Sequence, residues 1–152
     1  MSKKIIVLAL LVILLGILIY NHGKKIYLSD KYYNASEYIS VTKKDLDKLK
    51  NNNFLLYTYN SYCTFKVPCD SIFKKVMDKY NISILSMPIE EFKKTNYYKE
   101  VEYAPSIIII KNGKIRKFLD ANSDKDYDKY QKSSEFEKWL NKYIYLKRWY
   151  IW

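Results

Sequence analysis

The sequence predicts one α/β domain with three layers, α/β/α, and a mixed sheet, preceded by a single N-terminal transmembrane helix. Three observations lead to this prediction. An apolar run opens the chain, β-prone and helical segments then alternate, and an Asn-Gly pair signals a hairpin near the end. Alternation implies parallel strands, and the hairpin adds antiparallel ones. The chain has 152 residues, which is enough for one self-sufficient core after the apolar run and too few for two.

The apolar run, residues 5–20, is the predicted membrane segment. It holds 16 apolar or small residues without a charge, with lysine pairs at 3–4 and 24–25. At about 1.5 Å per residue it spans roughly 24 Å, and snorkelling lysines with Tyr20 at the interface can cover a ~30 Å hydrocarbon core. A signal-peptide core is the alternative. Because no small-x-small cleavage site follows the run, we expect an uncleaved signal-anchor.

Because lysines flank the run on both sides, the charge difference does not determine its orientation in the membrane. The lengths of the two flanks are the remaining argument. A short N-terminal flank and a large C-terminal domain are typical of a signal-anchor, which places the domain outside the cytoplasm as a single-pass protein of the cell membrane. The Lys, Asn, Ile and Tyr bias is typical of an AT-rich bacterial genome. We expect an anchor at 1–25, a juxtamembrane linker at 26–36, the domain at 37–146 and an aromatic tail at 147–152.

The net charge of +11 restricts the partners. Residues 1–25 contribute +4, so +7 is spread over the rest. A basic balance favours nucleic acid, anionic lipid or an anionic cell wall. Because the sequence has no nucleic-acid motif, phosphate loop or long basic stretch, we expect a Lys-rich surface near an anionic membrane and no nucleic acid. The one histidine, His22, lies beside the apolar run, so we expect no zinc site. We also expect no other metal and no cofactor.

The first elements of the domain are a short strand at 37–41 and a helix at 43–50. Thr42 followed by Asp45 predicts the N-terminal cap of that helix. Residues 54–59 form a continuous β-prone run, typical of a strand buried on both faces of a parallel sheet.

Proline residues open the next two predicted helices. Pro68 suits the first turn of a helix over 68–80, where apolar residues recur at helical spacing. A strand at 82–87 follows, and then a short helix at 90–99 opened by Pro88. Strands and helices alternate through this part of the chain.

The last part of the chain predicts a hairpin and a helix. A β-branched strand at 105–110 leads through Asn112-Gly113 into a strand at 114–119. Residues 119–132 are polar and are expected to form an exposed loop. A capping box at 134–137 starts the last helix, so the predicted order is βαβαβαββα.

Three local signatures and this element order resemble the thioredoxin family over residues 37–144. The signatures are strand 54–59 running into Tyr62-Cys63 and then Pro68-Cys69, Ala104-Pro105-Ser106 before a strand, and the Lys-Asn-Gly-Lys hairpin at 111–114. The resemblance implies a thioredoxin-like fold with a cis-proline at Ala104-Pro105. It also implies thiol-disulfide exchange with Cys63 attacking, Cys69 resolving, and Tyr62, Ala104 and Pro105 facing the substrate.

Two departures from the family bear on these roles. The family's cysteines are separated by two residues, but five residues separate Cys63 from Cys69. This spacing leaves Cys69 as the thiol that a helix N-terminus would acidify, so the two roles can be reversed. Tyr57 stands where many thioredoxins bury a carboxylate, and a phenol is a poor proton acceptor near neutral pH.

Two functions therefore remain as hypotheses. The first is a membrane-tethered extracytoplasmic thiol-disulfide oxidoreductase that acts on secreted or cell-surface proteins through Cys63 and Cys69. The second is a non-catalytic thioredoxin-like binding or accessory module of a transport or cell-envelope assembly, with the two cysteines as a structural disulfide. A bridge that closes such a seven-residue loop stabilises a fold by roughly 2 to 2.5 kcal/mol.

Overall fold

A five-stranded mixed sheet organises the domain. The computed structural model describes residues 7–16, 24–60 and 65–148. The strand order is β1-β3-β2-β4-β5, in which β1, β3 and β2 are parallel and β4 and β5 are antiparallel to their neighbours. The strands are β1 (Tyr38–Ser40), β2 (Phe54–Tyr59), β3 (Ile84–Pro88), β4 (Ser106–Lys111) and β5 (Lys114–Phe118). The mixed sheet predicted from alternation and the hairpin is confirmed.

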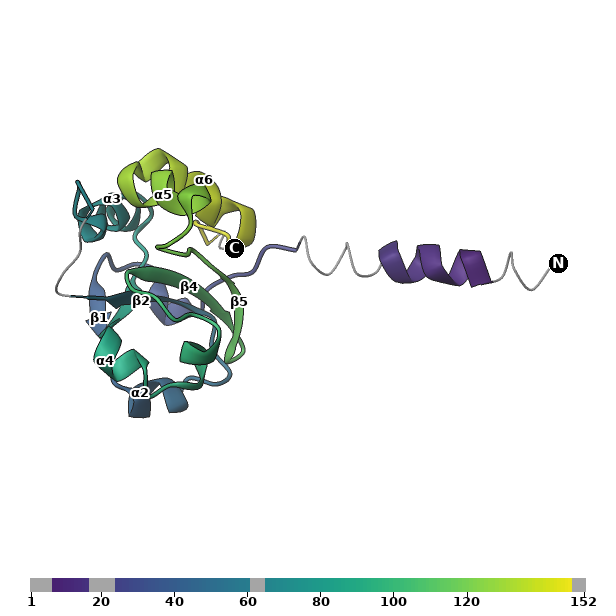
Figure 1. Ribbon diagram of the computed structural model, residues 1–152, viewed down its shortest axis with the longest axis horizontal. Helices are drawn as coiled ribbons and strands as arrows, with labels where there is room; N and C mark the ends of the chain where they lie inside the picture. Colours follow the sequence, from purple (N-terminus) through teal and green to yellow (C-terminus); the bar gives the residue numbers. More distant parts are fainter. Residues whose placement is uncertain (1–6, 17–23, 61–64, 149–152) are drawn as a thin grey trace.

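Helices cover both faces of this sheet, as Figure 1 shows. On one face lie α3 (Cys69–Tyr80), α5 (Asp124–Gln131) and α6 (Ser133–Tyr143), which pack against each other. On the other face lie α2 (Lys43–Asp47) and α4 (Ile89–Phe92). Two 3-10 turns complete the domain, η1 (Asp30–Tyr32) and η2 (Asn96–Lys99). The architecture is the predicted three-layer α/β/α sandwich.

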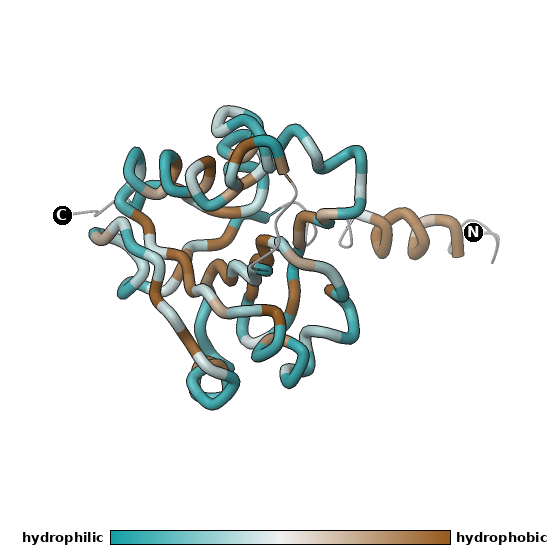
Figure 2. Tube along the Cα trace, turned by 60° about the vertical axis from the view of Figure 1, so that its left-hand side comes forward, coloured by the Kyte–Doolittle hydropathy of each residue, from teal (hydrophilic) through white to brown (hydrophobic). Residues whose placement is uncertain are grey.

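The centre of the sheet is buried on both faces. Residues 54–56 of β2 and 107–110 of β4 are 0% exposed. Their side chains alternate between the two helical layers, so a continuous apolar run is required at each strand. In Figure 2 the hydrophobic stretches gather toward the middle of the domain, whereas much of the surrounding trace is hydrophilic.

Helix α5 replaces the exposed loop that was expected at 119–132. The expectation was wrong because α5 buries only one of its side chains, Tyr130, which is 0% exposed. A helix with one buried residue shows almost no apolar periodicity, and its Asp and Lys side chains read as a solvated loop. Leu119, the first residue of that stretch, is also 0% exposed.

The boundaries of three predicted helices also differ in the structure. The Thr42 cap is confirmed, but its helix ends at Asp47 instead of Lys50, and the helix at 90–99 is divided between α4 and η2. The capping box at 134–137 does not form, because α6 already begins at Ser133. Glu137 instead accepts hydrogen bonds from Lys79 and Tyr80, which fastens α6 to the end of α3.

Residues 26–33, which we expected in a linker at 26–36, pack into the domain. Leu28 is 2% exposed. The Ile26 amide donates to the Tyr143 carbonyl at 2.9 Å, and the Ile26 carbonyl accepts from the Tyr145 amide at 2.9 Å. The folded unit therefore includes this segment as a neighbour of the chain that follows α6.

Residues 7–16 form a helix that is hydrophobic along its whole length (Figure 2). Its large apolar side chains are 51–64% exposed. In the part of the chain that the structure describes, no helix has both the length and the hydrophobicity of a membrane span. Residues 5–6 and 17–20 of the predicted span lie outside that part.

Candidate functional site

Cys69 is the first residue of α3, at the end of the sheet where β2 stops. Pro68 precedes it as the N-terminal cap residue, with φ −56°. Proline suits this position because its fixed φ matches the helix and its missing N–H has no partner to lose. The apolar side of α3 packs on the sheet and leaves Cys69 only 2% exposed. The thiol therefore lies in the first turn of the helix, the part where backbone N–H groups generally lack an i−4 acceptor.

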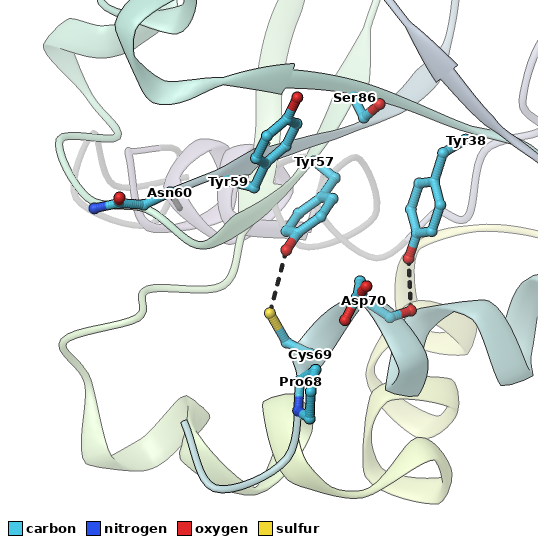
Figure 3. A pocket seen from close by; sticks show the side chains of 8 residues that line it. All are labelled: Tyr38, Tyr57, Tyr59, Asn60, Pro68, Cys69, Asp70 and Ser86. Carbon is cyan, nitrogen blue, oxygen red and sulfur yellow. Dashed lines mark hydrogen bonds between the residues drawn. The ribbon is translucent and has the colours of Figure 1, made fainter. Parts of the chain in front are cut away.

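Tyr57 reaches Cys69 from the neighbouring strand β2. Its hydroxyl oxygen lies 3.3 Å from the Cys69 sulfur, and Figure 3 shows the hydroxyl directed at that sulfur. The Tyr57 ring packs edge-on against Phe73 of α3, with the ring centroids 5.3 Å apart. Burial and the adjacent Cys69 raise the pKa of Tyr57 far above its usual value. The hydroxyl therefore keeps its proton at neutral pH and can donate a hydrogen bond to sulfur.

A cavity of about 360 Å³ lies beside the thiol. Its lining consists of three tyrosine rings, Cys69 and four further residues: Tyr38, Tyr57, Tyr59, Asn60, Pro68, Cys69, Asp70 and Ser86. The Tyr38 hydroxyl donates to the Asp70 carbonyl at 2.8 Å, which holds that ring against the start of α3. Burial, together with the Asp70 charge, raises the pKa of Tyr38. Of the tyrosines that line the cavity, Tyr57 presents its neutral hydroxyl to Cys69, and Tyr38 presents its own to the Asp70 carbonyl.

The predicted proline turn lies at the same end of the sheet. The Ala104–Pro105 peptide bond is cis, as the resemblance implied. β4 begins at the next residue, Ser106, whose register partner in β2 is Thr58. The turn is therefore adjacent to the end of β2, from which the chain runs to Cys69.

The structure places some of the predicted site residues and adds others. Cys69, Ala104 and Pro105 come to one end of the sheet, whereas Tyr62 and Cys63 lie outside the described residues. Tyr38 was not predicted, because its strand is only three residues long. Tyr130, whose hydroxyl donates to the Pro105 carbonyl, was not predicted either, because the residues around it have the composition of a loop.

Solved structures that are similar to this chain are thioredoxins. A mutant thioredoxin from Entamoeba histolytica superposes with a TM-score of 0.52 at 11% identity, covering 68% of this chain and 97% of that one. A Schistosoma mansoni thioredoxin gives 0.51 at 22% identity, covering 72% and 97%. A Nicotiana alata thioredoxin gives 0.50 at 16% identity, covering 72% and 93%. No protein-family model and no curated protein sequence matches the chain. The chain has a thioredoxin-like fold, which confirms that prediction.

The Tyr57 hydroxyl provides a first test of the site. In a Cys63→Ser background, Tyr57→Phe removes a donor to the Cys69 sulfur and so destabilises the thiolate. We expect the pKa of the Cys69 thiol to rise, which leaves less thiolate at neutral pH. The rise corresponds to a hydrogen bond to a charged group, worth about 1.5–3 kcal/mol. Thiolate absorbance followed against pH measures it.

Tyr38→Phe is the matched control for this test, since its hydroxyl donates to the Asp70 carbonyl and not to sulfur. Its titration should match that of the Cys63→Ser parent. An unchanged titration in Tyr57→Phe, with the fold intact, would show that the 3.3 Å contact does not stabilise the thiolate.

Proposed function

We propose that this chain is a membrane-tethered extracytoplasmic thiol-disulfide oxidoreductase that acts on secreted or cell-surface proteins through Cys63 and Cys69. The observation that carries the proposal is the position of Cys69. It is the first residue of α3, beside a donor hydroxyl, at the end of the sheet that also holds the cis Ala104–Pro105 turn. The thioredoxin-like fold supports the same reaction class.

The burial of Cys69 supports a division of roles between the two thiols. At 2% exposure, its sulfur is out of reach of a folded protein substrate. We therefore assign attack on the substrate to Cys63 and resolution to Cys69. This is the order that the family resemblance implies, and the opposite of the order that the helix dipole alone would favour.

In the direction of substrate reduction, the exchange has two steps. The Cys63 thiolate attacks one sulfur of a substrate disulfide, forming a mixed disulfide and releasing the other substrate sulfur as a thiolate. The Cys69 thiolate then attacks the Cys63 sulfur, which releases the second substrate thiolate and leaves Cys63 and Cys69 joined. Two electrons pass from the dithiol to the substrate, and oxidation of a substrate runs the same steps in reverse.

The Cys69 proton must leave before the second step. Tyr57 keeps its own proton, because its pKa is raised, so it cannot accept this one. The cavity beside Cys69 offers a route to solvent water, with Asp70 in its wall. On this proposal Tyr57 stabilises the thiolate, and water takes the proton.

Trapping of mixed disulfides tests both the activity and the roles. Cys69→Ser should accumulate disulfide-linked adducts with envelope proteins, because the second step is blocked. Cys63→Ser should form about as few adducts as the double cysteine variant. Non-reducing electrophoresis of cell-envelope extracts measures both.

Other patterns in the trapping experiment have definite meanings. Adducts in Cys63→Ser alone would reverse the roles. If no variant forms adducts, the oxidoreductase proposal fails, and the alternative of a binding or accessory module with a structural disulfide is favoured.

The apolar helix at 7–16 supports the membrane part of the proposal. Its exposed side chains would contact lipid if residues 5–20 form the anchor. Leu11→Lys places a charge near the middle of the run, which costs about 2.5–3.5 kcal/mol in membrane insertion. We expect much of this variant to be released by alkaline extraction of membranes, whereas wild type and Lys31→Gln remain bound.

Digestion of the domain by protease added to intact spheroplasts is expected for wild type. Protection of the domain until the cells are lysed would contradict an extracytoplasmic location.

A further inference from the structure

Helix α5 binds the backbone of the segment that leads into Cys69. The Gln131 side-chain oxygen accepts a hydrogen bond from the Val67 amide at 3.1 Å. The Gln131 side-chain nitrogen donates to the Val67 carbonyl at 3.2 Å. One side chain thus satisfies both polar groups of the same residue, as a neighbouring strand would. Two bonds of this kind fix the position and the orientation of Val67, two residues before the thiol.

Tyr130, the residue before Gln131, contacts the same segment with its ring. The ring stacks on Phe65, with centroids 5.1 Å apart and an angle of 16° between the planes. It also lies 5.8 Å from the ring of Phe73, which belongs to the helix that Cys69 begins. Tyr130 is 0% exposed, so these contacts are made inside the core.

The Tyr130 hydroxyl binds the proline turn on its other side. It lies 3.0 Å from the Pro105 carbonyl oxygen and 2.8 Å from the Leu119 carbonyl oxygen. Burial raises the pKa of Tyr130 well above its usual value, so the hydroxyl remains a donor. A single buried side chain therefore links the segment before Cys69 to Pro105, the proline of the cis peptide bond.

The long spacing between the cysteines explains why such a link matters. Five residues stand between Cys63 and Cys69, and a longer ring loses more conformational freedom when its ends are joined. Holding Phe65 and Val67 in place before the bond forms removes part of that loss. On the premise that the loop keeps this geometry when Cys63 and Cys69 are joined, the held loop favours the disulfide over the dithiol.

We propose that Tyr130 and Gln131 are positioning residues, which hold the Phe65–Val67 segment against the cis-proline turn and so set the dithiol–disulfide equilibrium of Cys63 and Cys69. This proposal rests on the proposed function in one respect, namely that the two cysteines form a redox pair.

The test measures the equilibrium itself in four variants of the full chain in detergent. Gln131→Ala removes both bonds to Val67, and Gln131→Glu keeps the acceptor but loses the donor. Tyr130→Phe keeps the stacked ring and loses the hydroxyl. Asp128→Asn is the control, since its carboxylate pairs with Lys132 at the surface of the same helix. Each protein is equilibrated in glutathione buffers, alkylated and weighed by mass spectrometry.

We expect Gln131→Ala and Tyr130→Phe to shift the equilibrium about tenfold toward the dithiol, which corresponds to about 30 mV for a two-electron couple. Gln131→Glu should shift it less, and Asp128→Asn should match wild type. A purely structural role would lower the melting temperature and leave the equilibrium unchanged. Circular dichroism identifies any variant that is unfolded. If Gln131→Ala is unfolded, the equilibrium of Gln131→Glu is compared with that of wild type instead.

The outcomes separate this proposal from the proposed function. Wild-type equilibria in folded Gln131→Ala and Tyr130→Phe would overturn the positioning role, and so would an equal shift in Asp128→Asn. The dithiol–disulfide equilibrium could shift in Gln131→Ala and Tyr130→Phe while the trapping experiment finds no mixed disulfides. That combination would uphold the positioning role and overturn the oxidoreductase proposal. Thiols that stay reduced in every buffer would overturn both.

Discussion

The simultaneous pairing of β2 with β3 and β4 is the constraint on which the rest of the structure depends. Because β2 is buried, its backbone groups must find partners on both sides, and this fixes its register against each neighbour. That register directs Tyr57 toward α3, where it meets Cys69, and sets Thr58 opposite Ser106, next to the proline turn. A slip of one residue would turn Tyr57 to the other face of the sheet and separate it from the thiol.

The sequence predicted the elements whose signals are local. Continuous apolar runs identified the central strands, Thr42 identified a cap, and Pro68 identified the start of α3. Helix α5 was not predicted, because a helix with one buried tyrosine has no periodic pattern of apolar residues. The N-terminal segment was assigned to a linker because the contact of Ile26 with the chain after α6 joins residues more than a hundred positions apart. Such contacts leave no mark in a local pattern.

The same division applies to the candidate site. Cys69 and Pro105 were identifiable because each belongs to a short motif, and Tyr57 because it stands where a carboxylate is usual in the family. The hydrogen bonds between Gln131 and Val67 were not identifiable, since a glutamine at the end of a polar stretch does not indicate a particular hydrogen-bond partner. What the structure adds is therefore the surroundings of the thiol: a neutral donor, a cavity lined by phenols, and a helix that holds the preceding segment.

These surroundings support the proposal that Cys69 is a redox-active thiol and not half of a structural disulfide. A donor to sulfur stabilises the thiolate, and a stable thiolate makes the dithiol form accessible. The reduction potential of the Cys63–Cys69 pair in the full chain, determined by equilibration with redox buffers of known potential, tests this claim most directly. The account predicts a potential between about −120 and −270 mV, the range of thiol-disulfide oxidoreductases. A potential below about −300 mV, as in structural disulfides, would contradict it.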